Sequence, residues 1–171
     1  MKTQHMLRVR ALAALAAVGL LASCSSTGTD GSGRTERRHS SWDEDMGAAQ
    51  VSDFMKVKVP KGATEVKGAV QVNPREDIYL LSFVTDEKQA VQVAEDLRSD
   101  APLRVRKHDV QPAGELFGHL GLAEPQILES ARWAGVCPPC VKDERRSEVA
   151  WIETYVHAQA QGKVRVYLQA F

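Results

Sequence analysis

Two cysteines separated by two prolines form the sharpest chemical motif of the sequence, Cys137-Pro138-Pro139-Cys140. Cysteines at this spacing suit three kinds of chemistry. As a disulfide the pair fixes a local turn, and a ring this small stabilises a fold by about 2 kcal/mol. As an exchange site it provides a thiolate of lowered pKa that attacks a partner disulfide. As a metal site it needs two further ligands, from among His108, His119 and His157.

The surroundings of this pair favour a structural disulfide. Thiol–disulfide exchange sites of the thioredoxin type follow an early strand and begin a helix, commonly with Trp directly before the first Cys. Here Trp133 lies four residues before Cys137, and the pair follows a segment that we predict to be helical. The histidines show no spacing typical of zinc ligands. We therefore predict a disulfide between Cys137 and Cys140, with thiol–disulfide exchange as the alternative, and expect neither a metal nor a cofactor.

The sequence contains no recognisable catalytic constellation. It has no His-Glu-x-x-His and no Gly-x-Ser-x-Gly motif. Gly114, Gly118 and Gly121 are spaced too loosely for a phosphate loop and lack the Lys-Ser/Thr end. We assign no catalytic residue, and the sequence favours a protein that is not an enzyme.

Two groups of side chains allow a binding function. Arg104, Arg106 and Lys107, together with His108, suit an anionic ligand, although we favour the solvated face of an outer strand. Near the end of the chain, four aromatic side chains fall on one face of a predicted hairpin. These are Trp151, Tyr155, Tyr167 and Phe171. They suit a ligand-binding strip, but we favour packing beneath a helix.

The elements that position these residues begin at Ser41, which has capping-box spacing to Glu44 and predicts a helix over 41–54. A strand follows over 68–72. The strand over 77–84 is apolar on both faces, which predicts a central position. Asp86 caps the next helix, whose buried stripe is formed by Ala90, Ala94 and Leu97.

The second half of the chain predicts a half-exposed strand over 103–110 and a helix that begins at Pro125 and reaches about Ala134. A hairpin of 149–157 and 164–171 closes the chain around Gln161-Gly162. Strands and helices without regular alternation predict an α+β fold. We expect a single small domain over 41–171, a mostly antiparallel sheet with two or three helices packed on it.

The N-terminal segment has the features of an export signal. Lys2, Arg8 and Arg10 precede the apolar run 11–21, which is too short to span a membrane. This run ends in Leu21-Ala22-Ser23-Cys24, which resembles the lipobox of bacterial lipoproteins. The resemblance implies that residues 1–23 are removed and that Cys24 carries a diacylglycerol, with acyl chains such as palmitate.

Cleavage before Cys24 leaves 148 residues with 19 basic and 22 acidic side chains, a net charge of −3. A mildly acidic domain gives no support for nucleic-acid binding. Residues 25–40 carry no large apolar side chain, so 24–40 is predicted to be a lipidated, flexible tether. Richness in Ala, and Arg in excess of Lys, resembles a high-GC actinobacterial proteome.

We therefore expect an envelope lipoprotein held on the extracytoplasmic face of a membrane by the acyl chains on Cys24. Its domain is expected to bind an envelope protein or a small ligand without catalysis. The alternative is an envelope thiol–disulfide oxidoreductase that uses Cys137 and Cys140.

Overall fold

The computed structural model describes residues 39–99, 101–106 and 110–171, which belong to one unit. The described residues form two α-helices and seven strands. In chain order they are β1 (Ser41–Asp43), α1 (Ala48–Phe54), β2 (Thr64–Val72), β3 (Ile78–Asp86), α2 (Glu87–Asp96), β4 (Arg104–Val105), β5 (Arg132–Val136), β6 (Ile152–Ala158) and β7 (Lys163–Ala170). Four short 3₁₀ helices lie at Phe117–Leu120, Pro125–Ile127, Glu144–Arg146 and Ala160–Gly162. Cys24, Lys107 and His108 lie outside the described residues.

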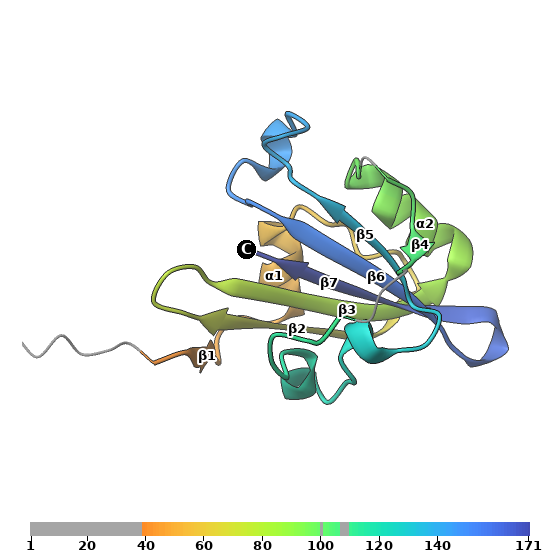
Figure 1. The fold of residues 1–171 in the computed structure, drawn as a ribbon, viewed down its shortest axis with the longest axis horizontal. Coiled ribbons are helices and arrows are strands. Elements are labelled where there is room, and N and C mark those ends of the chain that lie inside the picture. Colours follow the sequence, from red (N-terminus) through yellow and green to blue (C-terminus); the bar gives the residue numbers. More distant parts are fainter. Residues whose placement is uncertain (1–38, 100, 107–109) are drawn as a thin grey trace, which may run out of the picture. The chain divides into compact units, whose positions relative to one another are not determined.

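The seven strands form one sheet in the order β1-β2-β3-β7-β6-β5-β4, and each neighbouring pair is antiparallel. Figure 1 shows the C-terminal strand β7 between β3 and β6. The predicted α+β fold with a mostly antiparallel sheet is therefore confirmed.

Both α-helices pack on one face of this sheet. They share a core with apolar side chains of β3, β6 and β7, to which the helices contribute Val51, Ala90 and Val93 and the residues just after them contribute Met55 and Leu97. Gly68 of β2 permits the close approach of α1, because a Cβ atom at this position would lie 2.5 Å from the Cα of Ala48. The main hydrophobic core thus lies between the helices and the sheet.

The opposite face of the sheet is covered by the 3₁₀ helix Phe117–Leu120 and its flanking loop. Leu80, Phe117, Tyr155 and Tyr167 are buried there. The rings of Phe117 and Tyr167 meet edge to face, with centroids 5.1 Å apart. Irregular chain rather than a regular helix therefore covers this side, and it leaves room for cavities.

Three local predictions are confirmed. The side chain of Asp86 accepts a hydrogen bond from the backbone N–H of Gln89 at 2.8 Å and caps α2. Strand β3 is covered on both faces, since Leu80 and Leu81 point to opposite cores and both are fully buried. Strands β6 and β7 form the predicted hairpin, and its connection places Gln161 and Gly162 at positive φ.

The predicted helix over 41–54 is wrong in its first half. Ser41 begins β1, which pairs with the end of β2, and α1 starts only at Ala48. Trp42 explains the difference, because its ring stacks on His119 at a centroid distance of 3.8 Å and joins the core of the second face. The backbone N–H of Gly47, donating to Gln50 Oε1 at 3.2 Å, provides the actual helix start.

The predicted helix from Pro125 to Ala134 is also wrong. Only a 3₁₀ turn forms at 125–127, and the chain then reaches strand β5. Ser130 has a φ of 60°, which interrupts a helical backbone, and the following residues gain a full ladder with β6. The strand expected over 103–110 is likewise confined to Arg104–Val105 within the described chain.

Candidate functional site

Two adjoining cavities lie on the sheet face opposite the α-helices. The larger, of about 450 Å³, has walls that include Val105, Arg106, Val110, Ile127 and Tyr155. The smaller, of about 230 Å³, shares Arg106, Val110 and Tyr155 with it and extends toward the end of β7. Its walls also include Glu124, Glu153, Gln169 and Phe171. We call the two cavities together the Arg106 pocket.

Arg106 is held against two aromatic rings at the centre of this pocket. Trp133 of β5 and Tyr155 of β6 are directly opposite each other in the sheet. The guanidinium carbon of Arg106 lies 4.5 Å from the ring centroid of Trp133 and 5.1 Å from that of Tyr155. Its Nη2 donates to the Tyr155 hydroxyl at 2.6 Å and lies 3.6 Å from Glu153 Oε1. The sheet register thus positions a cation between two rings and a carboxylate.

Two titratable groups of the pocket, Tyr155 and Glu124, are shifted toward their neutral forms. Burial raises the pKa of Tyr155, and the hydrogen bond from its hydroxyl to Glu153 Oε2, at 2.8 Å, raises it further. Burial also raises the pKa of Glu124, although its carboxylate accepts a hydrogen bond from the Gly118 N–H at 3.0 Å. Tyr155 therefore remains a neutral phenol that donates a hydrogen bond rather than acting as a base.

Buried polar atoms without partners gather around this pocket. Five such side-chain atoms occur in the described chain, and four belong to residues in or directly behind its walls. They are Arg106 Nε, Gln126 Oε1, Trp133 Nε1 and Gln169 Oε1. An unpaired buried polar atom costs about 1–3 kcal/mol. A polar ligand at this place would remove part of that cost.

Exposed aliphatic side chains border the same pocket. Val105, Val110 and Ile127 line the larger cavity, and they are 54%, 39% and 65% exposed. Only two other large apolar side chains of the described chain, Val66 and Val72, reach comparable exposure. The Arg106 pocket therefore combines unpaired polar atoms with an apolar rim, which is the usual composition of a ligand site.

The dicysteine forms a second candidate site. Cys137 and Cys140 are joined in a disulfide with a Cα–Cα distance of 5.2 Å, directly after β5. The backbone N–H of Cys140 donates to Cys137 Sγ at 3.2 Å. Cys140 is exposed and Cys137 is half-buried. No α-helix follows the pair in the described chain, since the chain continues through turns into the 3₁₀ helix Glu144–Arg146.

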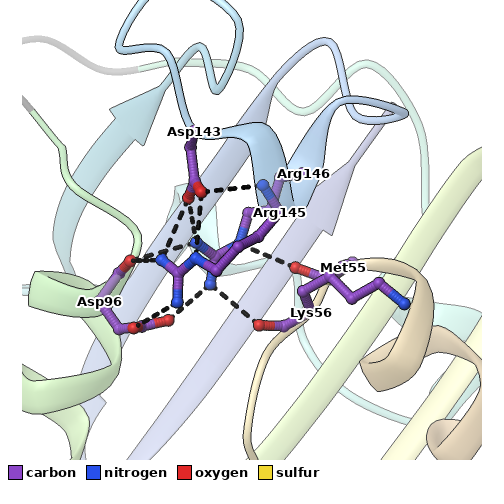
Figure 2. Close-up of polar contacts among 6 residues, drawn as sticks. All are labelled: Met55, Lys56, Asp96, Asp143, Arg145 and Arg146. Atoms are coloured by element: carbon purple, nitrogen blue, oxygen red, sulfur yellow. Dashed lines mark hydrogen bonds and ion pairs between the residues drawn. The ribbon is translucent and has the colours of Figure 1, made fainter.

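A buried ionic cluster lies just after the disulfide (Figure 2). Arg146 is fully buried and forms ion pairs with Asp143 and with Asp96 of α2. Its Nε donates to the Met55 carbonyl at 2.9 Å, and Nη2 donates to the Lys56 carbonyl at 2.9 Å. Its Nη1 also donates to the backbone carbonyl of Asp96 at 3.1 Å. The guanidinium therefore binds the C-terminal ends of both α-helices.

The carboxylates of this cluster are stabilised in their charged forms. Hydrogen bonds from Arg145 and Arg146 lower the pKa of Asp143 to about 2. Burial alone raises the pKa of Asp96, but hydrogen bonds from the same two arginines outweigh it, and the pKa is lowered. Every N–H of the Arg146 guanidinium has an acceptor available within the fold, so this side chain has no donor left for a ligand.

The remaining predicted positions are dispersed. Arg104 is exposed as expected, whereas Arg106 is half-buried and lines the pocket instead of lying on a solvated face. His119 stacks on Trp42, and His157 Nδ1 lies 3.1 Å from Gln159 Nε2 at the surface. Among the described residues, no group of three His, Cys, Asp or Glu side chains could hold a metal ion.

The aromatic residues of the hairpin combine two roles. Tyr155 and Tyr167 are buried beneath Phe117, which confirms packing but places it under a 3₁₀ helix and loop instead of an α-helix. Tyr155 and Phe171 also line the Arg106 pocket. Trp151 lies over Gly135, where a Cβ would come within 2.5 Å of its ring, so only glycine allows this close approach.

Sequence reasoning missed the Arg146 cluster, and at Arg106 it considered an anionic ligand but favoured a solvated strand face. Arg145 and Arg146 stand in a charged stretch that suggests a solvated surface, and the partners of Arg146 other than Asp143 lie about 50 and 90 residues away. The pocket residues are dispersed along the sequence, since Gln126 and Gln169 lie 20 and 63 positions after Arg106. Neither a family model, nor a curated protein, nor a solved structure matches this chain.

Proposed function

We propose that this protein is a lipid-anchored binding protein of a bacterial envelope, attached through Cys24, whose domain holds a ligand in the Arg106 pocket. The clustering of four unpartnered buried polar atoms around one pair of cavities carries the proposal. The resemblance of residues 21–24 to a lipobox supports the anchor. No helix of the described chain is long and apolar enough to cross a membrane.

The pocket supports binding rather than catalysis. Arg106, Tyr155 and Glu153 hydrogen-bond or ion-pair with one another, so the guanidinium and the phenol are already engaged. The raised pKa of Tyr155 removes it as a base near neutral pH. A site of this kind positions a ligand without offering a nucleophile.

The anchor is tested by the Cys24→Ala variant, expressed in a bacterium that processes lipoproteins. We expect the wild-type chain in the membrane fraction, with the mass of two or more acyl chains added to a chain that begins at Cys24. The variant should leave the membrane and keep its signal segment. A Cys137→Ala/Cys140→Ala variant serves as the matched control and should remain membrane-bound. Normal cleavage and membrane retention of Cys24→Ala would contradict the anchor.

The binding role is tested by thermal unfolding of the purified full chain against a panel of short peptides, oligosaccharides, nucleosides and fatty acids. We expect at least one class to raise the melting temperature of the wild type and not that of Arg106→Gln. Arg75→Gln, an exposed change of the same kind in the β2–β3 connection, should respond as the wild type does. A panel without any Arg106-dependent response would contradict the binding role.

One observation favours a second function, thiol–disulfide exchange at Cys137 and Cys140. The Cys140 N–H that donates to Cys137 Sγ would stabilise a Cys137 thiolate, and the exposed Cys140 offers access to a partner. Reduction of insulin by the reduced protein, together with a reduction potential in the glutathione range, would support this function. A pair that stays oxidised against glutathione and leaves insulin intact would reject it.

A further inference from the structure

We infer that the Arg106 pocket binds an extended peptide segment that carries an aliphatic side chain. The inference rests on the proposed binding function and names the class of its ligand. It follows from the hydrogen-bonding groups of the walls, from their charge and from the rim.

The unpaired atoms of the walls include donors and acceptors together. Arg106 Nε is a donor, whereas Gln126 Oε1 and Gln169 Oε1 are acceptors. A ligand that matches them needs its own acceptor and its own donors within a short distance. Each peptide unit supplies one C=O and one N–H, so an extended segment presents both alternately. Carboxylate and phosphate groups present acceptors alone.

The charge of the walls disfavours an anionic ligand. The walls contain three carboxyl side chains, those of Glu124, Glu129 and Glu153, and one guanidinium, that of Arg106. Arg106 is already engaged with Glu153, and burial raises the pKa of Glu124 toward its neutral form. A neutral peptide backbone adds no further charge to be desolvated, so it fits these walls better than an acid or a phosphate ester.

The aromatic rings of the pocket are not free to stack on a sugar or a nucleobase. The Arg106 guanidinium already lies over the rings of Trp133 and Tyr155. Tyr155 is also only 1% exposed. Flat ligands that depend on ring stacking therefore find no open ring face at these two residues.

The rim supplies the contact for a side chain. Val105, Val110 and Ile127 expose aliphatic carbon around the cavity of about 450 Å³, which is large enough for one aliphatic residue and its flanking peptide units. Burial of such a side chain against this rim is favourable by about 25 cal/mol per Å². The pocket therefore pairs backbone recognition at its walls with side-chain selection at its edge.

The test uses the full chain in detergent micelles and N-acetylated, C-amidated pentapeptides Gly-Ser-X-Ser-Gly, in which X is leucine, valine, serine or aspartate. Titration calorimetry should give measurable binding for leucine and valine. Binding should be at least about tenfold weaker for serine and for aspartate, because the aliphatic contact is lost.

Two variants test the two parts of the pocket separately. Arg106→Gln should weaken binding of the leucine peptide at least about tenfold, because a charged hydrogen-bond donor is lost. Ile127→Asp should weaken binding of the same peptide by a similar factor, because it removes an aliphatic contact at the rim. Ile127 is exposed enough that the fold tolerates the change. The matched controls are Arg75→Gln and Val66→Asp, both outside the pocket walls, and they should bind as the wild type does.

The outcomes separate this inference from the function on which it rests. If no pentapeptide binds while an oligosaccharide or a fatty acid stabilises the wild type and not Arg106→Gln, the peptide inference is overturned and the binding function stands. If neither peptides nor any other class shows a response that depends on Arg106, both are overturned. Equal binding of all four pentapeptides would overturn the aliphatic selection.

Discussion

Two arginines, the fully buried Arg146 and the half-buried Arg106, lie on opposite faces of the same sheet and are used in different ways. Arg146 is completely enclosed, and its guanidinium binds two carboxylates and the carbonyl ends of both helices. Arg106 keeps 21% of its side chain exposed, lies between two rings and leaves its Nε without a partner. The first arginine completes the fold, whereas the second lies in a cavity that the fold leaves incomplete.

The difference shows which feature of a buried charge indicates function. Burial alone does not, since Arg146 is the more buried of the two. What marks Arg106 is the combination of unmatched hydrogen-bonding groups and an exposed apolar rim within one cavity. A network in which every buried group is hydrogen-bonded gains no further bond from a ligand, whereas one with unpaired groups gains hydrogen bonds when a ligand binds. The following predictions test this contrast.

The largest effect is expected from Arg146→Leu. It removes one of the two arginine partners of the buried Asp143 and the donors to the two helix ends, and the loss of one partner of a buried pair costs about 3–5 kcal/mol. Arg106→Leu should cost only about 1 kcal/mol, because Glu153 keeps access to water. Urea unfolding of the full chain measures both values. Equal losses for the two variants would remove the contrast.

Loss of the disulfide should have an intermediate effect confined to the Arg146 side. The Cys137→Ser/Cys140→Ser variant is expected to lose about 2 kcal/mol of stability, because the short ring no longer restricts the unfolded chain. Peptide binding at Arg106 should stay unchanged. Treatment of the wild type with a thiol reductant should reproduce the loss of stability. Weakened peptide binding in either case would show that the two faces are coupled.

Acid should remove the stabilisation that the ionised Asp143 gives to the Arg146 cluster. The pKa of Asp143 in the folded protein is about 2, below its ordinary value of 3.8, so the unfolded chain binds more protons between these values. The stabilisation from Asp143 is therefore present above about pH 4 and is lost as the pH falls toward 2. Urea unfolding at a series of pH values should show that the free energy of unfolding falls more steeply with decreasing pH for the wild type than for Asp143→Asn. Identical slopes would contradict the assignment.

The smallest effect is expected at an exposed arginine. Arg132 forms an ion pair with Glu87 at 2.7 Å, with the two side chains 31% and 49% exposed. Arg132→Gln should change stability by no more than about 0.5 kcal/mol, and high salt should remove the difference. The loss of stability in Arg132→Gln is the reference against which the losses in Arg146→Leu and Arg106→Leu are compared. A cost similar to that of Arg146→Leu would mean that exposure does not separate these sites.

Local signals in the sequence predicted a substantial part of the fold. The Asp86 cap, the doubly apolar strand β3 and the β6–β7 hairpin each depend on residues within a few positions of one another. The two wrong helices failed where distant contacts decided the outcome. Ser41 has good capping chemistry, but Trp42 gains more from the second core than from a helix. Pro125 begins only a turn, because the following segment completes the sheet beside β6.

The candidate site was harder to predict than the fold for the same reason. Arg106 and Arg146 look alike in sequence, each next to another basic residue in a polar segment. Their roles depend on partners in other strands and helices, which local periodicity does not report. The disulfide is the exception, because its two cysteines are close in the chain. Its use, structural or redox, depends again on surroundings that only three dimensions provide.

The position of β7 sets the order in which this protein can assemble. The last strand separates β1, β2 and β3 from β6, β5 and β4, and pairs with both β3 and β6. A chain that emerges N-terminus first from a ribosome therefore holds two unjoined half-sheets until residues 163–170 arrive. Closure of the whole sheet, and with it the core that β3, β6 and β7 share, is delayed to the end of synthesis.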